Sequence, residues 1–114
     1  MKWAVHDSYT SKYTVFSTPE TDPYIALLIA IEMGHFEPYG GKEDWDEEME
    51  VLMDNHGLSE SEAECELASE GFDLIGAYMV DMTTVDIKPV PSNIQEGVYN
   101  SPTLKPMAYK GLKR

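Results

Sequence analysis

Basic residues are almost absent from the middle of this chain of 114 residues. Between Ser17 and Asp73 there are seventeen Asp and Glu residues and a single base, Lys42. The net charge of −13 therefore comes from the middle, while both ends of the chain are slightly basic. Negative charge of this density repels nucleic-acid phosphates and anionic lipids and attracts basic protein surfaces. We expect a protein partner with a basic surface, or identical or neighbouring subunits. We expect no direct nucleic-acid binding by the acidic body and no membrane binding.

Cysteine and long apolar runs are also scarce. The lone Cys65 cannot form a disulfide within the chain, which indicates a reducing compartment or an assembly that needs no disulfides. The longest apolar run, Tyr24 to Ile31, is too short to span a bilayer. Met1 leads straight into a polar mixed segment, unlike a signal peptide. We expect a cytoplasmic or virion protein that is not secreted through a signal peptide.

Apolar residues make up 42% of the chain, too many for a disordered acidic protein. Residues 2–7 and 12–17 are rich in aromatic and β-branched side chains and flank a polar stretch, which predicts an N-terminal β-hairpin. Residues 72–82 predict a strand with a bulge at Gly76, and residues 83–87 extend it or form a fourth strand. The rival interpretation of residues 72–79 is a continuation of the preceding helix.

Three helices are predicted between these strands. The first runs over residues 23–33, with Asp22 as its N-cap, and is expected to be buried on all sides because residues 25–31 are all apolar. The second covers residues 43–55, with one apolar stripe. The third covers residues 60–69 and begins with a capping box, Ser59 to Glu62.

The fold class predicted from these elements is α+β. We expect a small antiparallel sheet, made of the N-terminal hairpin and the 72–87 region, with the three helices packed on one face. Residues 1–88 are predicted to form the compact domain. Residues 89–114, punctuated by four prolines, are predicted to form an extended arm that binds rather than packs into the core. The arm residues expected to contact a partner are Ile94, Val98, Tyr99, Leu104, Met107 and Tyr109.

Catalytic and metal-binding patterns are weak. The three histidines lack the helical spacing that places two metal ligands on one face, and His35 and His56 suit helix C-termini instead. A metal site that combines His35 with nearby acids is the alternative. Cys65 lies between two glutamates whose charge suppresses the thiolate, so we expect it to fill the core. We predict no enzymatic activity, no catalytic residue, no metal and no cofactor.

The acidic helices are the strongest functional feature. Ordinary surface helices mix both charge signs and gain from pairs four residues apart, whereas these helices contain almost no bases. One interpretation is a structural or assembly protein, such as a viral or phage particle component, that binds a basic neighbour. The alternative is a nucleic-acid mimic that occupies the basic groove of a nucleic-acid-handling protein, and the simplest interpretation is a solubilising surface. The candidate residues are Asp44, Asp46, Glu47, Glu48, Glu50, Glu60 and Glu64.

Overall fold

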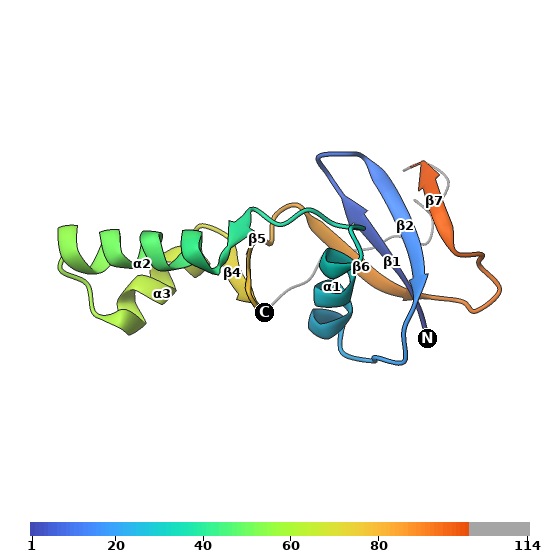
Figure 1. The fold of residues 1–114 in the computed structure, drawn as a ribbon, viewed down its shortest axis with the longest axis horizontal. Helices are drawn as coiled ribbons and strands as arrows, with labels where there is room; N and C mark the ends of the chain where they lie inside the picture. The colour runs from blue at the N-terminus through green and yellow to red at the C-terminus, as the bar shows by residue number, and fades with distance from the viewer. Residues whose placement is uncertain (101–114) are drawn as a thin grey trace. The chain divides into compact units, whose positions relative to one another are not determined.

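The computed structural model of the protein describes residues 1–100 and divides them into two compact units (Figure 1). Unit 1 combines residues 1–37 with residues 84–100, and unit 2 comprises residues 38–83. Unit 2 is therefore an insertion between the two halves of unit 1. The boundary predicted after Lys88 falls inside a strand of unit 1.

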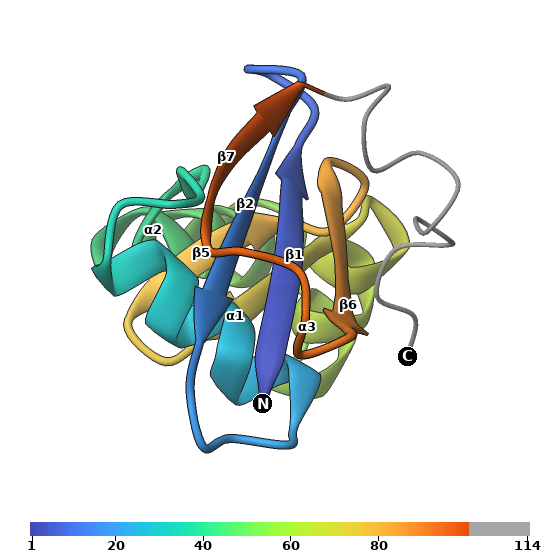
Figure 2. The same ribbon diagram turned by 90° about the vertical axis from the view of Figure 1, so that its right-hand side faces the viewer.

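Unit 1 is a four-stranded antiparallel sheet with one helix. The predicted hairpin is confirmed as β1 (Lys2–Asp7) and β2 (Lys12–Ser17), with Trp3 opposite Phe16. β6 (Val85–Val90) pairs with β1, and β7 (Gly97–Asn100) pairs with β2. The strand order is β6-β1-β2-β7, which Figure 2 shows face-on.

The two faces of this sheet are covered by different parts of the chain. On one face lies α1 (Pro23–Glu32), and the indole Nε1 of Trp3 donates to the carbonyl of Glu20, just before that helix, at 3.0 Å. On the other face Tyr13, Val15 and Val90 form a buried cluster, together with Ala4 and the half-buried Ile94 and Tyr99.

The first helix begins where the sequence predicts, because Asp22 accepts a hydrogen bond from the Tyr24 N–H at 2.8 Å. The expectation that it is buried on all sides is wrong. Leu27 is 0% exposed, whereas Ile25 is 42% exposed and Leu28 is half-buried. A helix laid along one face of a sheet buries only the side that contacts the strands, whatever its composition.

The prediction that the chain from Val90 onward lies outside the core is wrong for the described residues. Val90 is buried, and Ile94 and Tyr99 pack against its cluster. Pro89 is compatible with β6 because β6 is an edge strand. Proline has no N–H to donate, and on an edge strand that position can face away from the neighbouring strand without the loss of a hydrogen bond between strands. Of the other predicted arm contacts, Val98 is exposed on β7. Leu104, Met107 and Tyr109 lie outside the described residues.

Unit 2 contains two helices and a three-stranded sheet of order β3-β5-β4. The elements are β3 (Gly40–Gly41), α2 (Lys42–Asn55), α3 (Glu60–Ser69), β4 (Phe72–Ile75) and β5 (Tyr78–Asp81). The predicted capping box of α3 is confirmed, with Ser59 and Glu62 bonded to each other's backbone N–H.

The strand region after α3 differs from the prediction. Gly76, with φ of 60°, lies in a turn between β4 and β5 rather than in a bulge, so residues 72–81 form a hairpin and not one strand or a helix. That hairpin pairs with β3, and of the predicted 72–87 region only residues 85–87, the first half of β6, pair with the N-terminal hairpin. The α+β class is confirmed, but the strands form two sheets and the helices are divided between the units.

The core of unit 2 is small. Met49, Leu67 and Met79 are buried with Ala63, and four partly buried side chains pack at its margin: Trp45, Leu52, Leu58 and Phe72. The predicted apolar stripe of α2 thus faces α3 and the sheet, although Met53 at its end is 38% exposed. Cys65, predicted to fill the core, is exposed on α3. The small Ala63 and the buried Leu67 take the inward positions of α3 instead.

The unequal burial of two neighbouring leucines in α1 predicts unequal stability effects. Leu27→Ala should lower the free energy of unfolding by about 2–5 kcal/mol, because it leaves a cavity in the core. Leu28→Ala removes the same atoms from a half-buried position and should cost about 1 kcal/mol. Urea unfolding of both variants measures the difference, and equal losses would contradict the one-sided burial of α1.

Candidate functional site

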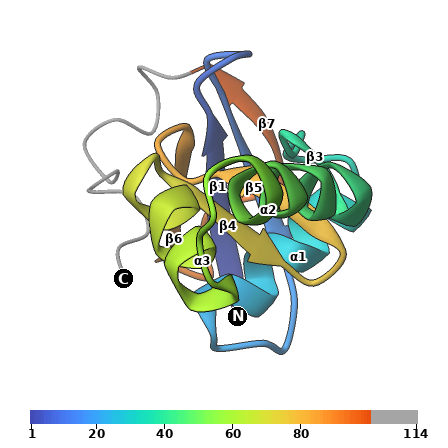
Figure 3. The ribbon, with the colours of Figure 1, turned by 90° about the vertical axis from the view of Figure 1, so that its left-hand side faces the viewer.

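The acidic hairpin, defined as residues 42–69, carries most of the charge of the chain. Its helices α2 and α3 lie side by side (Figure 3) and hold eleven acidic residues and one base, Lys42. All seven acids predicted for partner binding are exposed. The structure therefore brings the two predicted acidic segments together into one surface, at the cost of repulsion between like charges.

Some carboxylates of the acidic hairpin have structural partners. Asp44 accepts a hydrogen bond from the Gly41 N–H at 2.8 Å, which ties down the start of α2. Asp46 pairs with Lys42 at 2.8 Å, an exposed pair four residues apart that adds little stability. Among the described residues the remaining predicted acids have no hydrogen bond or ion pair: Glu47, Glu48, Glu50, Glu60 and Glu64. These five are available to a partner.

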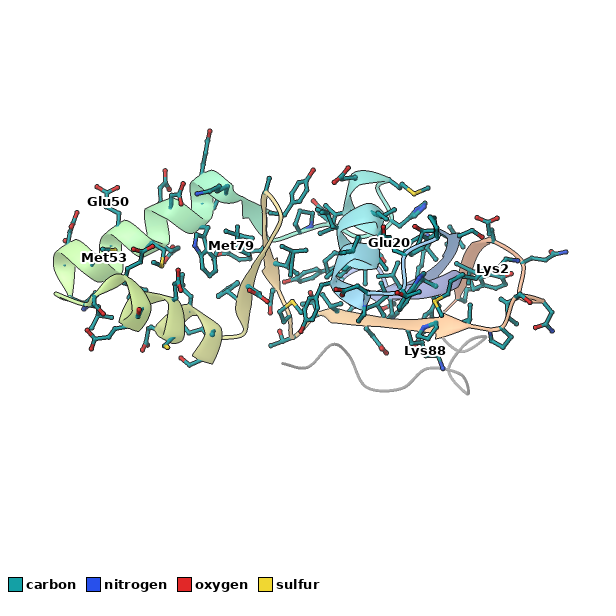
Figure 4. All side chains as sticks on the ribbon, turned by 90° about the horizontal axis from the view of Figure 1, so that it is seen from below. Lys2, Glu20, Glu50, Met53, Met79 and Lys88 are labelled. Carbon is teal, nitrogen blue, oxygen red and sulfur yellow. The ribbon has the colours of Figure 1, made fainter. Side chains whose placement is uncertain are left out.

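Apolar atoms interrupt the charge on α2. Val51 is 44% exposed, and it lines a shallow depression with Glu47, Glu50 and Asp54. Figure 4 shows the Glu50 side chain projecting away from α2. A partner that approaches this depression meets carboxylates around an accessible aliphatic side chain. Val51 was not among the residues predicted from the sequence, although helical spacing places it close to Glu47.

A second concavity, the α3 groove, runs along the side of α3 opposite its buried residues. It measures about 390 Å³ and is lined by Leu58, Ser61, Glu62, Cys65, Glu66 and Ser69. Five of them are spaced by three and four residues on one face of α3, and Leu58 lies just before the helix. The charge pattern of α3 did not predict this groove, because the groove also depends on the weakly polar residues between the glutamates.

Unit 1 holds a separate row of titratable side chains. His6, Tyr13 and Asp86 lie opposite one another on the neighbouring strands β1, β2 and β6. The rings of His6 and Tyr13 are 4.6 Å apart. His6 Nε2 and Asp86 Oδ1 are buried, and neither has a hydrogen-bond partner within residues 1–100. We call these three residues the polar row.

Burial decides the electrostatics of the polar row. It raises the pKa of the Asp86 carboxyl, and the opposing influence of His6 and Lys88 is smaller. Burial also raises the pKa of the Tyr13 hydroxyl, with a further contribution from the negative charge of Asp86. A carboxylate beside an imidazole is a pair that enzymes use for general-base catalysis. In the described part of the chain, however, no serine or cysteine side chain is hydrogen-bonded to His6.

The other histidines occupy the predicted helix ends. His35 follows α1, where its N–H donates to the Ala30 carbonyl at 2.8 Å, and His56 is the C-cap of α2. The alternative interpretation joined His35 to nearby acids in a metal site. Within the first hundred residues, no three His, Cys, Asp or Glu side chains are grouped closely enough to hold a metal ion.

The comparisons with known proteins add no precedent for these surfaces. No protein family, curated protein or solved structure matches the chain. Over the residues that the structure describes, none of the three helices has the length and apolarity needed to cross a bilayer.

Ionisation of Asp86 and ionisation of Glu62 should change the stability of the fold in opposite directions, which can be tested by varying the pH. The folded-state pKa of Asp86 is raised, so its charged form destabilises the fold and stability is lost as the pH rises through that pKa. The pKa of Glu62 is lowered by hydrogen bonds with the Ser59 backbone and hydroxyl, so its stabilisation is present at neutral pH and is lost as the pH falls through the lowered pKa.

Asp86→Asn should therefore raise the melting temperature at neutral pH, and Glu62→Gln should lower it. As the pH falls, the Asp86→Asn difference should fade first, because the raised pKa is reached before the lowered pKa of Glu62. Thermal unfolding followed by circular dichroism from neutral to acidic pH is the measurement. A destabilised Asp86→Asn variant at neutral pH would show that contacts of the charged carboxylate outweigh its burial.

Proposed function

We propose that the protein is a non-enzymatic assembly subunit that binds a basic protein surface through the acidic hairpin. The end of the chain, residues 101–114, provides a second contact with neighbouring subunits, in a cytoplasmic or virion assembly. The observation that carries the proposal is the exposure of five unpaired glutamates beside accessible apolar side chains in one small unit.

The like-charge spacing of α2 supports binding over solubility alone. Glu43 and Glu47, and then Glu50 and Asp54, are four residues apart, where charges of one sign destabilise a helix. A solubilising surface achieves its purpose with mixed signs and without such repulsion. Bases on a partner relieve the repulsion on binding, and the exposed Val51 and Met53 add apolar area that binding removes from water.

The second candidate function is mimicry of nucleic acid. Its specific support is that the carboxylates follow two adjacent helices, so that negative charge recurs along an elongated surface. Such a surface competes with DNA or RNA for the basic groove of a nucleic-acid-binding protein. Displacement of a fluorescent DNA duplex from a basic DNA-binding protein distinguishes the two functions, because an assembly subunit has no reason to compete at the DNA site.

Charge reversal on α2 tests the proposed function. Glu47→Lys combined with Glu50→Lys should abolish binding of a synthetic lysine-rich peptide, measured by fluorescence anisotropy. These positions are preferred because Asp44 and Asp46 have structural partners whose loss would confuse the result. Folding should be unchanged or improved by a few tenths of a kcal/mol per pair, since each substituted side chain would face an acid four residues away.

The matched control is Glu20→Lys combined with Glu32→Lys, which changes the net charge equally but lies in unit 1. This control should retain most of the peptide affinity. Wild-type binding should also weaken steeply between low and high salt, because screening shortens the reach of the charges. Equal losses in both double variants would mean that the peptide senses net charge only, and the acidic hairpin would then be a solubilising surface.

A further inference from the structure

The basic residues missing from the acidic hairpin are concentrated at the end of the same chain. Residues 101–114 contain Lys105, Lys110, Lys113 and Arg114 and no acid, so this segment holds half of the eight bases of the protein. We propose that the α3 groove of one copy binds residues 101–114 of a second copy. The inference rests on the proposed function and names the partner of the acidic hairpin.

The α3 groove offers both kinds of surface that this segment requires. Leu58 and the exposed Cys65 provide apolar contact, while the carboxylates of Glu62 and Glu66 lie beside them. The buried residues of α3, Ala63 and Leu67, point into the core of unit 2. Apart from Leu58, which also packs at the margin of the core, the groove is therefore lined from the outer side of α3.

The composition of residues 101–114 matches this lining. Apolar and basic residues stand side by side, as in Leu104-Lys105, Tyr109-Lys110 and Leu112-Lys113. A peptide with this pattern can bury apolar side chains against Leu58 and Cys65 while its bases reach the carboxylates. Peptide grooves commonly combine such apolar anchoring with charge recognition. The two binding surfaces are thus complementary in polarity as well as in charge.

The geometry of assembly follows from the use of two different surfaces. A groove on one copy and a terminal segment on the next form a head-to-tail contact, not a contact between identical patches. Such contacts close into rings or continue into filaments. Residue 101 follows directly after β7, which is an edge strand of unit 1.

Cys65 makes the proposal directly testable, because it is the single cysteine of the chain and lines the groove. A photoreactive maleimide is attached to Cys65 of the unlabelled full-length protein, which is then mixed with an isotopically heavy copy and irradiated. Mass spectrometry should find crosslinks from light Cys65 to heavy residues 101–114. Crosslinks to other segments only, or to the same light chain only, would overturn the proposal.

A probe attached to Cys65 could itself block the groove, so a second measurement uses the protein without a probe. In the full chain without a probe, Lys110→Glu should weaken self-association, measured by analytical ultracentrifugation, by about fivefold or more. The matched control Lys12→Glu makes the same charge change at an exposed position of β2 and should leave self-association unchanged. Equal effects of the two variants, or no self-association by the wild type, would also overturn the proposal.

Failure of this inference is distinguishable from failure of the proposed function. In one outcome, the lysine-rich peptide binds in a manner that depends on Glu47 and Glu50, but Cys65 does not crosslink to residues 101–114. The acidic hairpin then binds a basic surface of another protein, and only the inference about residues 101–114 is wrong. If the lysine-rich peptide also fails to bind, the proposed function is wrong as well.

Discussion

The pairing of β6 with β1 is the constraint on which the rest of the structure depends. It returns the chain to the N-terminal hairpin after unit 2, so that residues 38–83 begin and end at unit 1. The same pairing places Val90 beside Ala4 and leads the chain to β7 on the opposite edge of the sheet. Without it, the N-terminal hairpin would lose one of the two strands that flank it, and a small sheet needs such additional strands to be stable in water.

Unit 2 combines a small core with a large charge. Its central contacts are Met49, Leu67 and Met79, and the flexible methionine side chains fill the space between two helices and a short sheet. The acids of the acidic hairpin remain outside, where Asp44, Asp46 and Glu62 cap a helix or pair locally and the others have no hydrogen bond or ion pair in residues 1–100. Because unit 2 carries far more negative charge than unit 1, binding through the acidic hairpin can be altered without disturbing the larger sheet.

The two candidate sites differ in what the side chains can do. The polar row is partly buried and titratable, so its influence is on the stability of unit 1 and on the pH at which that stability changes. The acidic hairpin is exposed and charged, so its influence is on the partners that the protein attracts. Electrostatic attraction of this kind sets specificity and association rate more than affinity, which is why the apolar residues beside the charges matter.

Local chemistry in the sequence determined the helices, their caps and the N-terminal hairpin. Asp22, and Ser59 with Glu62, act on N–H groups within three residues, so their effect does not depend on the rest of the fold. The acidic character of α2 and α3 could likewise be predicted from the sequence alone. Tertiary structure alone decided that the strands form two sheets, that Val90 is buried, and that Cys65 is exposed. These outcomes depend on which distant strand or helix lies opposite each residue, and a pattern of neighbours along the chain does not contain that information.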